Sequence, residues 1–141
     1  MINDGLKMTG AVAIALNGEV VQEIPNLVVT AGKNFVASRM KDTTKAAMTH
    51  MAIGTNNTTA AVGQTALSAE VARGALTSTT VSNNTIAYVE TFAAGVGTGA
   101  IVEAGVFNAS SSGDMLCRTV FAVVNKGSAD AMTITWTISV S

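Results

Sequence analysis

The last third of the chain, residues 99–141, decides the fold, and it reads GAIVEAGVFNASSSGDMLCRTVFAVVNKGSADAMTITWTISVS. Its final run alternates between large apolar residues and the hydroxyl-bearing residues threonine and serine. Trp136, the only tryptophan of the chain, lies on the apolar side of this alternation. A period of two with β-branched residues is typical of a strand with one buried face. The stretch therefore predicts three strands joined by two polar turns, with Trp136 in the core.

Shorter strands and tight turns precede this block. Asn17-Gly18 lies between two apolar runs and predicts a hairpin, because both residues accept the positive φ of a type I′ turn. The expected register places Leu16 opposite Glu19 and Ile14 opposite Val21. A second hairpin is predicted around Asn83-Asn84. The predicted strands are residues 9–16, 19–24, 48–54, 75–82, 85–93, 100–107, 114–124 and 132–140.

One helix is predicted, over residues 31–41. Thr30 is a candidate N-cap, and Phe35, Val36 and Met40 form an apolar stripe at helical spacing. Residues 65–73 fit either a helical turn or an extended segment. About eight strands, one short helix and turns every 8–12 residues favour a mainly β fold, an antiparallel β-sandwich or jelly roll. We expect one domain over residues 1–141, with residues 1–8 as an N-terminal arm.

The composition excludes several classes of partner. The chain has 141 residues, a formal net charge of −1 and only 12% charged residues, which is about half the usual share. Without clustered lysine and arginine, no nucleic-acid partner is expected. No apolar run approaches the ~18 residues of a membrane-spanning helix, so no membrane partner is expected either. Low charge and high apolar content instead favour a surface that is covered by another protein or by copies of the chain.

Three features suggest chemistry, and each has a simpler structural explanation. The run from Gly95 to Ala100 matches the dinucleotide-binding pattern G-x-G-x-x-A, but that motif requires a following helix and the next residues favour a strand. His50 is the only histidine and Cys117 the only cysteine, so the two alone cannot supply a common zinc site or an internal disulfide. We therefore expect a hairpin loop, a histidine on a sheet face and a small buried thiol.

The acidic residues are scattered, and no pair has the spacing of an acid–base couple or a calcium loop. Glu103 stands out because it lies within an apolar strand. If Phe107 pairs with Asp114, then Glu103 faces Arg118, and a structural ion pair explains the acid without catalysis. Accordingly we expect no enzyme, no catalytic, cofactor-binding or metal-binding residues, and no cofactor.

A collective resemblance extends over about residues 49–141. It rests on the AIG strand at 52–54, the E-x-A-R step at 70–73, IVEAGVF at 101–107, MLCRTVF at 115–121 and the alternating strand TITWTISVS at 133–141. These blocks resemble small virion proteins of tailed bacteriophages. The first 45 residues carry no comparable resemblance.

The resemblance implies a structural role in a phage particle, and it leaves two roles open. One is a capsid cement or decoration protein on the outer capsid surface, made in the host cytoplasm and bound to the major capsid protein, often as a dimer or trimer. The other is a tail, collar or fibre-attachment component. The short domain without a stalk or coiled coil favours the cement protein. Contact elements would be the arm, residues 55–63, Asn17-Gly18 and residues 108–113. A carbohydrate-binding sandwich is disfavoured, because aromatic residues make up only 4% of the chain.

Overall fold

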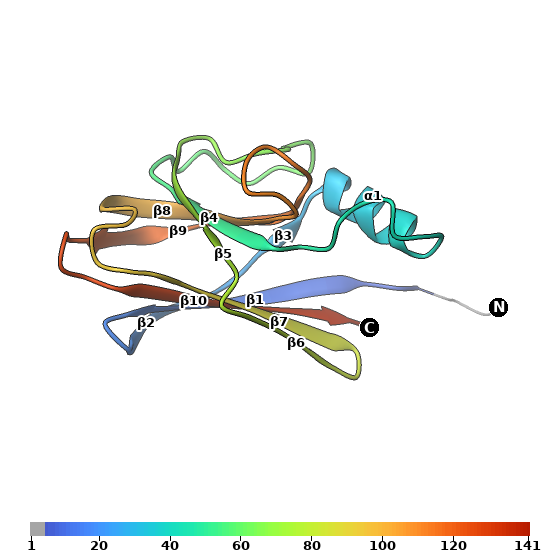
Figure 1. The fold of residues 1–141 in the computed structure, drawn as a ribbon, viewed down its shortest axis with the longest axis horizontal. Coiled ribbons are helices and arrows are strands. Elements are labelled where there is room, and N and C mark those ends of the chain that lie inside the picture. The colour runs from blue at the N-terminus through green and yellow to red at the C-terminus, as the bar shows by residue number, and fades with distance from the viewer. Residues whose placement is uncertain (1–4) are drawn as a thin grey trace.

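The computed structural model describes residues 5–141, and it is a sandwich of two five-stranded antiparallel sheets with one short helix (Figure 1). The first sheet has the strand order β2-β1-β10-β7-β6, and the second has the order β3-β9-β8-β4-β5. The strands are β1 (Met8–Leu16), β2 (Glu19–Pro25), β3 (Leu27–Val28), β4 (His50–Gly54), β5 (Glu70–Ala75), β6 (Ser78–Ser82), β7 (Thr85–Phe92), β8 (Gly99–Phe107), β9 (Met115–Lys126) and β10 (Met132–Val140). The predicted antiparallel β-sandwich with one helix is thus confirmed.

The closing strand β10 lies at the centre of the first sheet, as its alternation predicts. It pairs with β1 on one side and with β7 on the other. Trp136 is fully buried between the sheets, while Thr135 and Thr137 on either side of it are only partly buried. Tyr88 and Val12 are its cross-strand neighbours, and both are buried. Since burial of a large apolar side chain contributes about 1.5–3 kcal/mol, this row is a main source of stability.

The structure has ten strands rather than the eight predicted, and β3 and β5 account for the difference. β3 is only two residues long, and it pairs with Arg118 and Cys117 of β9. β5 covers the end of the ambiguous segment 65–73, and it is extended because β4 offers it a free edge. In both places pairing with a distant strand decides the conformation, and local sequence does not show that.

The helix α1 spans Thr30–Arg39, close to the predicted range. The prediction of Thr30 as N-cap is wrong: Val29 holds that position without a side-chain hydrogen bond, and the Thr30 backbone N–H donates to the carbonyl of Val62 at 2.7 Å. Phe35 is buried, as the stripe predicts, but Met40 lies past the end of the helix and is 84% exposed.

Both predicted registers are shifted by bulges. Leu16 faces Glu19 as predicted, but an irregularity after Ile14 places Ile14 opposite Gln22 rather than Val21. In the second sheet Phe107 pairs with Met115 rather than with Asp114, and an irregularity between Val106 and Phe107 adds a further shift, so Glu103 faces Val120 and not Arg118. An extra residue on one strand moves every later pair by one position, and hairpin turn rules do not anticipate it.

The N-terminal arm predicted over residues 1–8 lies partly outside the described residues, which begin at Gly5. Within the described part, Lys7 and Ser141 exchange backbone hydrogen bonds of 2.6 and 2.8 Å, and Met8 is already the first residue of β1. The two described ends of the chain therefore run side by side. Among residues 5–141 no helix is long and apolar enough to cross a membrane.

Candidate functional site

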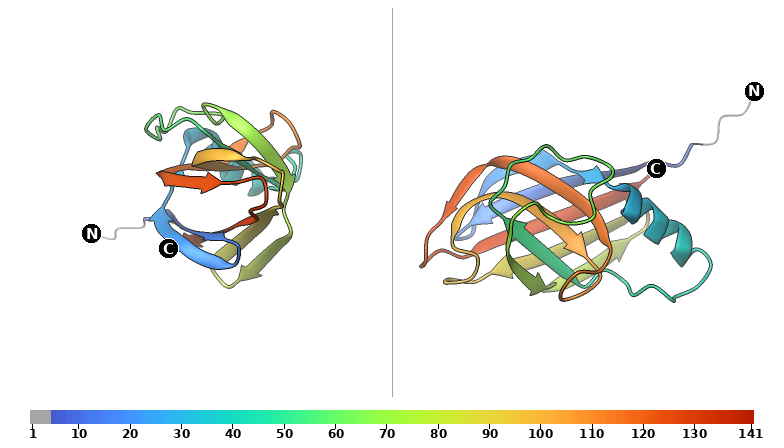
Figure 2. Two further views of the ribbon diagram at one scale, coloured as in Figure 1. Left: turned by 90° about the vertical axis from the view of Figure 1, so that its left-hand side faces the viewer. Right: turned by 90° about the horizontal axis from the view of Figure 1, so that it is seen from above.

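The outer face of the second sheet is covered by the loop of residues 55–69, as Figure 2 shows from two sides. A small second core lies beneath this face, apart from the main core between the sheets. Its buried members are Val29, Ala52, Leu67, Phe107 and Met115. The loop therefore has apolar anchoring of its own, and the second sheet is buried on both faces over part of its area.

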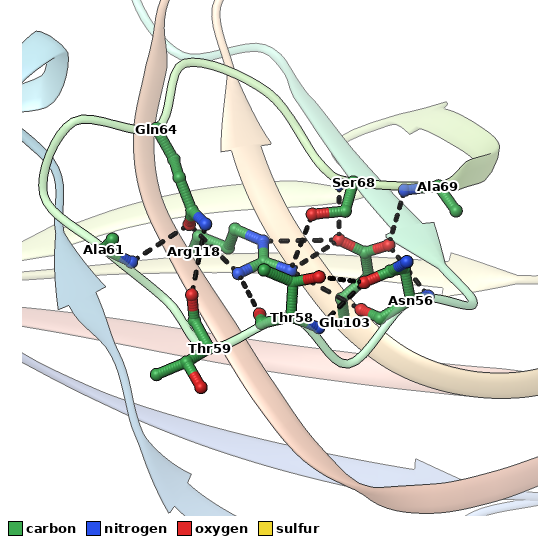
Figure 3. A network of polar contacts seen from close by, with 9 residues as sticks. All are labelled: Asn56, Thr58, Thr59, Ala61, Gln64, Ser68, Ala69, Glu103 and Arg118. Carbon is green, nitrogen blue, oxygen red and sulfur yellow. Dashed lines mark hydrogen bonds and ion pairs between the residues drawn. The ribbon is translucent and has the colours of Figure 1, made fainter.

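The Glu103 carboxylate holds both ends of this loop (Figure 3). Near the start of the loop, the backbone N–H of Asn56 donates to Oε2 at 3.1 Å. At the end of the loop, the N–H groups of Ser68 and Ala69 donate to Oε1 and Oε2, both at 2.8 Å. Hydrogen bonds from backbone N–H to a charged acceptor are stronger than neutral ones, so one side chain closes the loop.

Arg118 forms a fully buried ion pair with Glu103 and holds the middle of the loop. Its Nη2 lies 2.9 Å from Oε1 of Glu103, and both side chains are completely excluded from solvent. Its Nη1 donates to the carbonyl of Thr58 at 2.8 Å and to Oε1 of Gln64 at 3.0 Å. The predicted partnership of Glu103 and Arg118 is correct. Its geometry is diagonal across β8 and β9 rather than directly opposite, because Gly105 faces Arg118.

Gly54 makes room for this arrangement at the end of β4. A Cβ atom on Gly54 would lie 2.5 Å from Oε2 of Glu103 and 2.5 Å from the carbonyl oxygen of Ala69. Any larger residue would displace either the carboxylate or the loop. The small residue at this position is therefore required by the buried acid, not by a turn.

A second arginine fixes the neighbouring turn of residues 108–113. The guanidinium carbon of Arg73 lies 3.8 Å from the centre of the Phe107 ring. Its Nη1 donates to the carbonyls of Ala109 and Ser112 at 3.0 and 2.9 Å, and Glu70 pairs with the opposite side of the group. Sequence reasoning missed this role of Arg73. The only signal was a lone arginine three residues after a glutamate, which is too common to be informative.

Two of the elements proposed for contact, residues 55–63 and 108–113, therefore lie on one face of the molecule and are held in fixed shapes. A shallow recess lies beside the first of them, lined by Asn57, Thr59 and Ala60 of the loop together with Pro25, Leu27 and Val120. The other two proposed elements lie elsewhere. Asn17 donates to Asp130 at 2.9 Å, beside the turn between β9 and β10, and the described part of the arm runs beside Ser141.

The outer face of the first sheet is different in character. Along β1, β10, β7 and β6 it presents only small or uncharged side chains, and most of them are partly or fully exposed. The register aligns these residues in rows across the sheet. The members of the face are Thr9, Ala11, Ala13, Ala15, Ser78, Thr80, Ser82, Thr85, Ala87, Val89, Thr91, Thr133, Thr135, Thr137 and Ser139.

The residues considered for chemistry lie far apart and have structural environments. Residues 95–98 lie in the loop before β8, and a strand rather than a helix follows them. His50 begins β4 and its Nδ1 lies 2.7 Å from the hydroxyl of Thr49. Cys117 is fully buried in the main core, where burial raises the pKa of its thiol. No group of three or more His, Cys, Asp or Glu side chains placed to hold a metal occurs within residues 5–141.

Comparison of the chain with protein-family models, with curated proteins and with solved structures finds no match. The site is therefore defined by its geometry alone. It is a face built from two loops that are distant in the sequence, one held by the fully buried Arg118 and the other by the partly buried Arg73, on a β-sandwich scaffold.

Proposed function

We propose that this chain is a structural protein of a phage particle, a cement or decoration protein that sits on the outer capsid surface. In this role it bridges neighbouring major capsid protein subunits and stabilises the shell by binding, without catalysis and without a cofactor. The observation that carries the proposal is the face formed by residues 55–69 and 108–113, whose loops are fixed by the buried Glu103–Arg118 pair and by Arg73. The resemblance of residues 49–141 to small virion proteins supports the same role.

Fixed loops suit a protein that must bind many identical sites. A loop that is already ordered loses little conformational entropy on binding, so more of the contact energy appears as affinity. The charges of Glu103 and Arg118 are satisfied by partners inside the protein. The loop from Thr55 to Ala69 itself contains no charged residue, so its exposed surface is uncharged. Modest contacts of this kind become strong when they are repeated over a symmetric shell.

The location of the chain in assembled particles tests the proposal. We expect hundreds of copies per particle by quantitative gel densitometry, and density at symmetry-related positions of the shell by cryo-electron microscopy. A few copies confined to the tail vertex would contradict the cement role and support the tail, collar or fibre-attachment alternative. Absence from purified particles would contradict both roles.

A pair of matched variants tests the contact face. Val62 in the loop is 49% exposed and Val123 near the C-terminal end of β9 is 52% exposed, so lysine fits at either position without disturbing the core. We expect Val62→Lys to reduce incorporation into particles at least tenfold and Val123→Lys to leave it unchanged. Equal incorporation of both variants, with unchanged thermal stability, would show that this face does not contact the capsid.

A further inference from the structure

Strand β6 is an edge strand without the usual protection against pairing with another chain. Its five residues, Ser78–Ser82, are all exposed, and no further strand of the described chain lies beyond them. Between Arg73 and Glu90 the sequence contains no charged residue and no proline. The pairing of β6 with β7 has no register shift, so the strand is also regular. Such an edge is a template for strand addition.

The other three edges of the sandwich are each protected. β2 contains Glu19, Glu23 and Pro25, and a bulge interrupts its pairing with β1. β3 is only two residues long, and β5 carries both Glu70 and Arg73 together with an irregular register. Charges, proline, bulges and short length are the devices by which edge strands avoid association. Of the four edge strands, only β6 has none of these devices, so its edge is open to pairing with another strand.

The hairpin formed by β6 and β7 determines which backbone N–H and C=O groups of β6 point away from the sheet. Ser82 and Thr85 flank the two-residue turn at Asn83-Asn84, so their backbone groups bond to each other. Bonded and non-bonded positions alternate along an antiparallel pair. The N–H and C=O groups of Thr80 therefore point towards β7, while those of Thr79 and Val81 point away from the sheet.

We propose that two copies of this chain pair through β6 in antiparallel orientation about a two-fold axis at Thr80. Thr79 of each copy then faces Val81 of the other, and their outward N–H and C=O groups bond to one another. Thr80 faces its own counterpart across the axis. A strand that pairs with itself in this way closes at the dimer and leaves no free copy of the same edge. The first sheet of one copy and the first sheet of the other then form one continuous sheet.

The side chains along β6 are compatible with this pairing. Thr80 lies on the outer face, where two threonines opposite each other form a favourable cross-strand pair. Val81, which is 69% exposed in the single chain, gains a neighbour in Thr79 of the other copy. No like charges are brought together, because none of the five residues is charged. The dimer rests on β6 alone and does not require a role in a phage particle.

Disulfide trapping tests the register. Two residues facing each other at a non-bonded antiparallel position have Cα atoms about 4.5 Å apart, within the range of a disulfide. We expect Thr80→Cys to form a cross-linked dimer under mild oxidation. Ser78→Cys is the matched control, because its two copies would lie about 13 Å apart along the strand. The native Cys117 does not compete, since it is fully buried. Equal cross-linking of both variants, or of neither, would overturn the register.

Sedimentation of the full chain tests the dimer itself. We expect a mass of twice 14.3 kDa for the unmodified protein at high concentration. Val81→Lys should give the monomer, since it places charge on the pairing edge. Val20→Lys, at a β2 position that is 57% exposed, should leave the dimer intact. A monomer for the unmodified protein at all concentrations, a trimer, or a dimer that survives Val81→Lys with unchanged thermal stability would overturn the proposal.

Discussion

The carboxylate of Glu90, on β7 of the first sheet, occupies the space that a side chain at Gly74, on β5 of the second sheet, would fill. A Cβ atom on Gly74 would fall 2.0 Å from Oε2 of Glu90. The carboxylate is held there by the hydroxyl of Thr77 at 2.9 Å and the backbone N–H of Thr91 at 2.7 Å. The two sheets thus approach closely at this edge because one strand has a glycine where the other has a buried acid.

This contact predicts that Gly74→Ala destabilises the fold by about 1–3 kcal/mol, since the methyl group must displace a buried, hydrogen-bonded carboxylate. Urea denaturation measures the free energy of unfolding. Gly63→Ala is the matched control and should change it by less than ~0.5 kcal/mol, because nothing lies within 4 Å of a Cβ at that position. If Gly74→Ala costs as much in a Glu90→Ala background as in the native one, the two residues do not conflict.

The buried ion pair predicts strong and coupled effects. Glu103→Gln and Arg118→Met should each destabilise the protein by about 3–5 kcal/mol, because each leaves the other charge buried without its partner. The double variant should cost clearly less than the sum of the two, as a double-mutant cycle from urea denaturation shows. Additive losses would mean that the two groups contribute independently.

Removal of the Arg73 guanidinium should loosen the turn of residues 108–113 without unfolding the sandwich. Lysine cannot reproduce the two-sided pairing with Glu70 or the flat contact with Phe107, so we expect Arg73→Lys to cost about 1–2 kcal/mol. Hydrogen exchange of the turn should accelerate while that of β10 stays slow. Arg39→Lys is the control, since Arg39 donates to a single carbonyl, that of Lys45, and lies 6.0 Å from the Phe35 ring. Equal effects would contradict this role of Arg73.

The alkaline limit of stability should follow Tyr88, the only tyrosine. Burial raises the pKa of Tyr88 to about 12, whereas an unfolded tyrosine ionises near pH 10. The folded state therefore holds this proton more tightly. Its stabilising contribution is fully present below about pH 10 and is lost as the pH rises towards 12. Tyrosinate absorbance should appear together with unfolding; ionisation near pH 10 in the folded protein would contradict the buried position.

Cys117 should resist thiol reagents in the native protein. Its side chain is fully buried, and burial raises the pKa of the thiol, so almost no thiolate is available at pH 8. We expect labelling only at the rate of unfolding, and immediate labelling in urea. Val20→Cys, at a β2 position that is 57% exposed, serves as the positive control. Rapid labelling of Cys117 in the folded state would show that the main core opens locally.

The alternation in β10 made the sandwich predictable, because one strand with a buried tryptophan requires a second layer to cover it. The Glu103–Arg118 partnership was also predictable, since two charges within apolar strands need each other. Its function as the closure of residues 55–69 was not, because that depends on backbone N–H groups that are distant in the sequence. Extra residues in β2 and β9 shifted both registers, and no local signal marks them. Arg73 was missed for the same reason, since its partners come together only in the folded chain.

The central position of β10 has a consequence for the order of folding. β1 and β7 are separated by about half of the chain, and the strand that joins them is synthesised after both. Until Met132–Val140 has left the ribosome, the first sheet cannot assemble and the main core lacks Trp136. Folding must then bring Met8 beside Val140, a non-local pairing of the kind that makes β proteins fold slowly. Between the synthesis of β7 and that of β10, the nascent chain therefore carries two unpaired strand edges, and yield in the cell depends on keeping them apart during that interval.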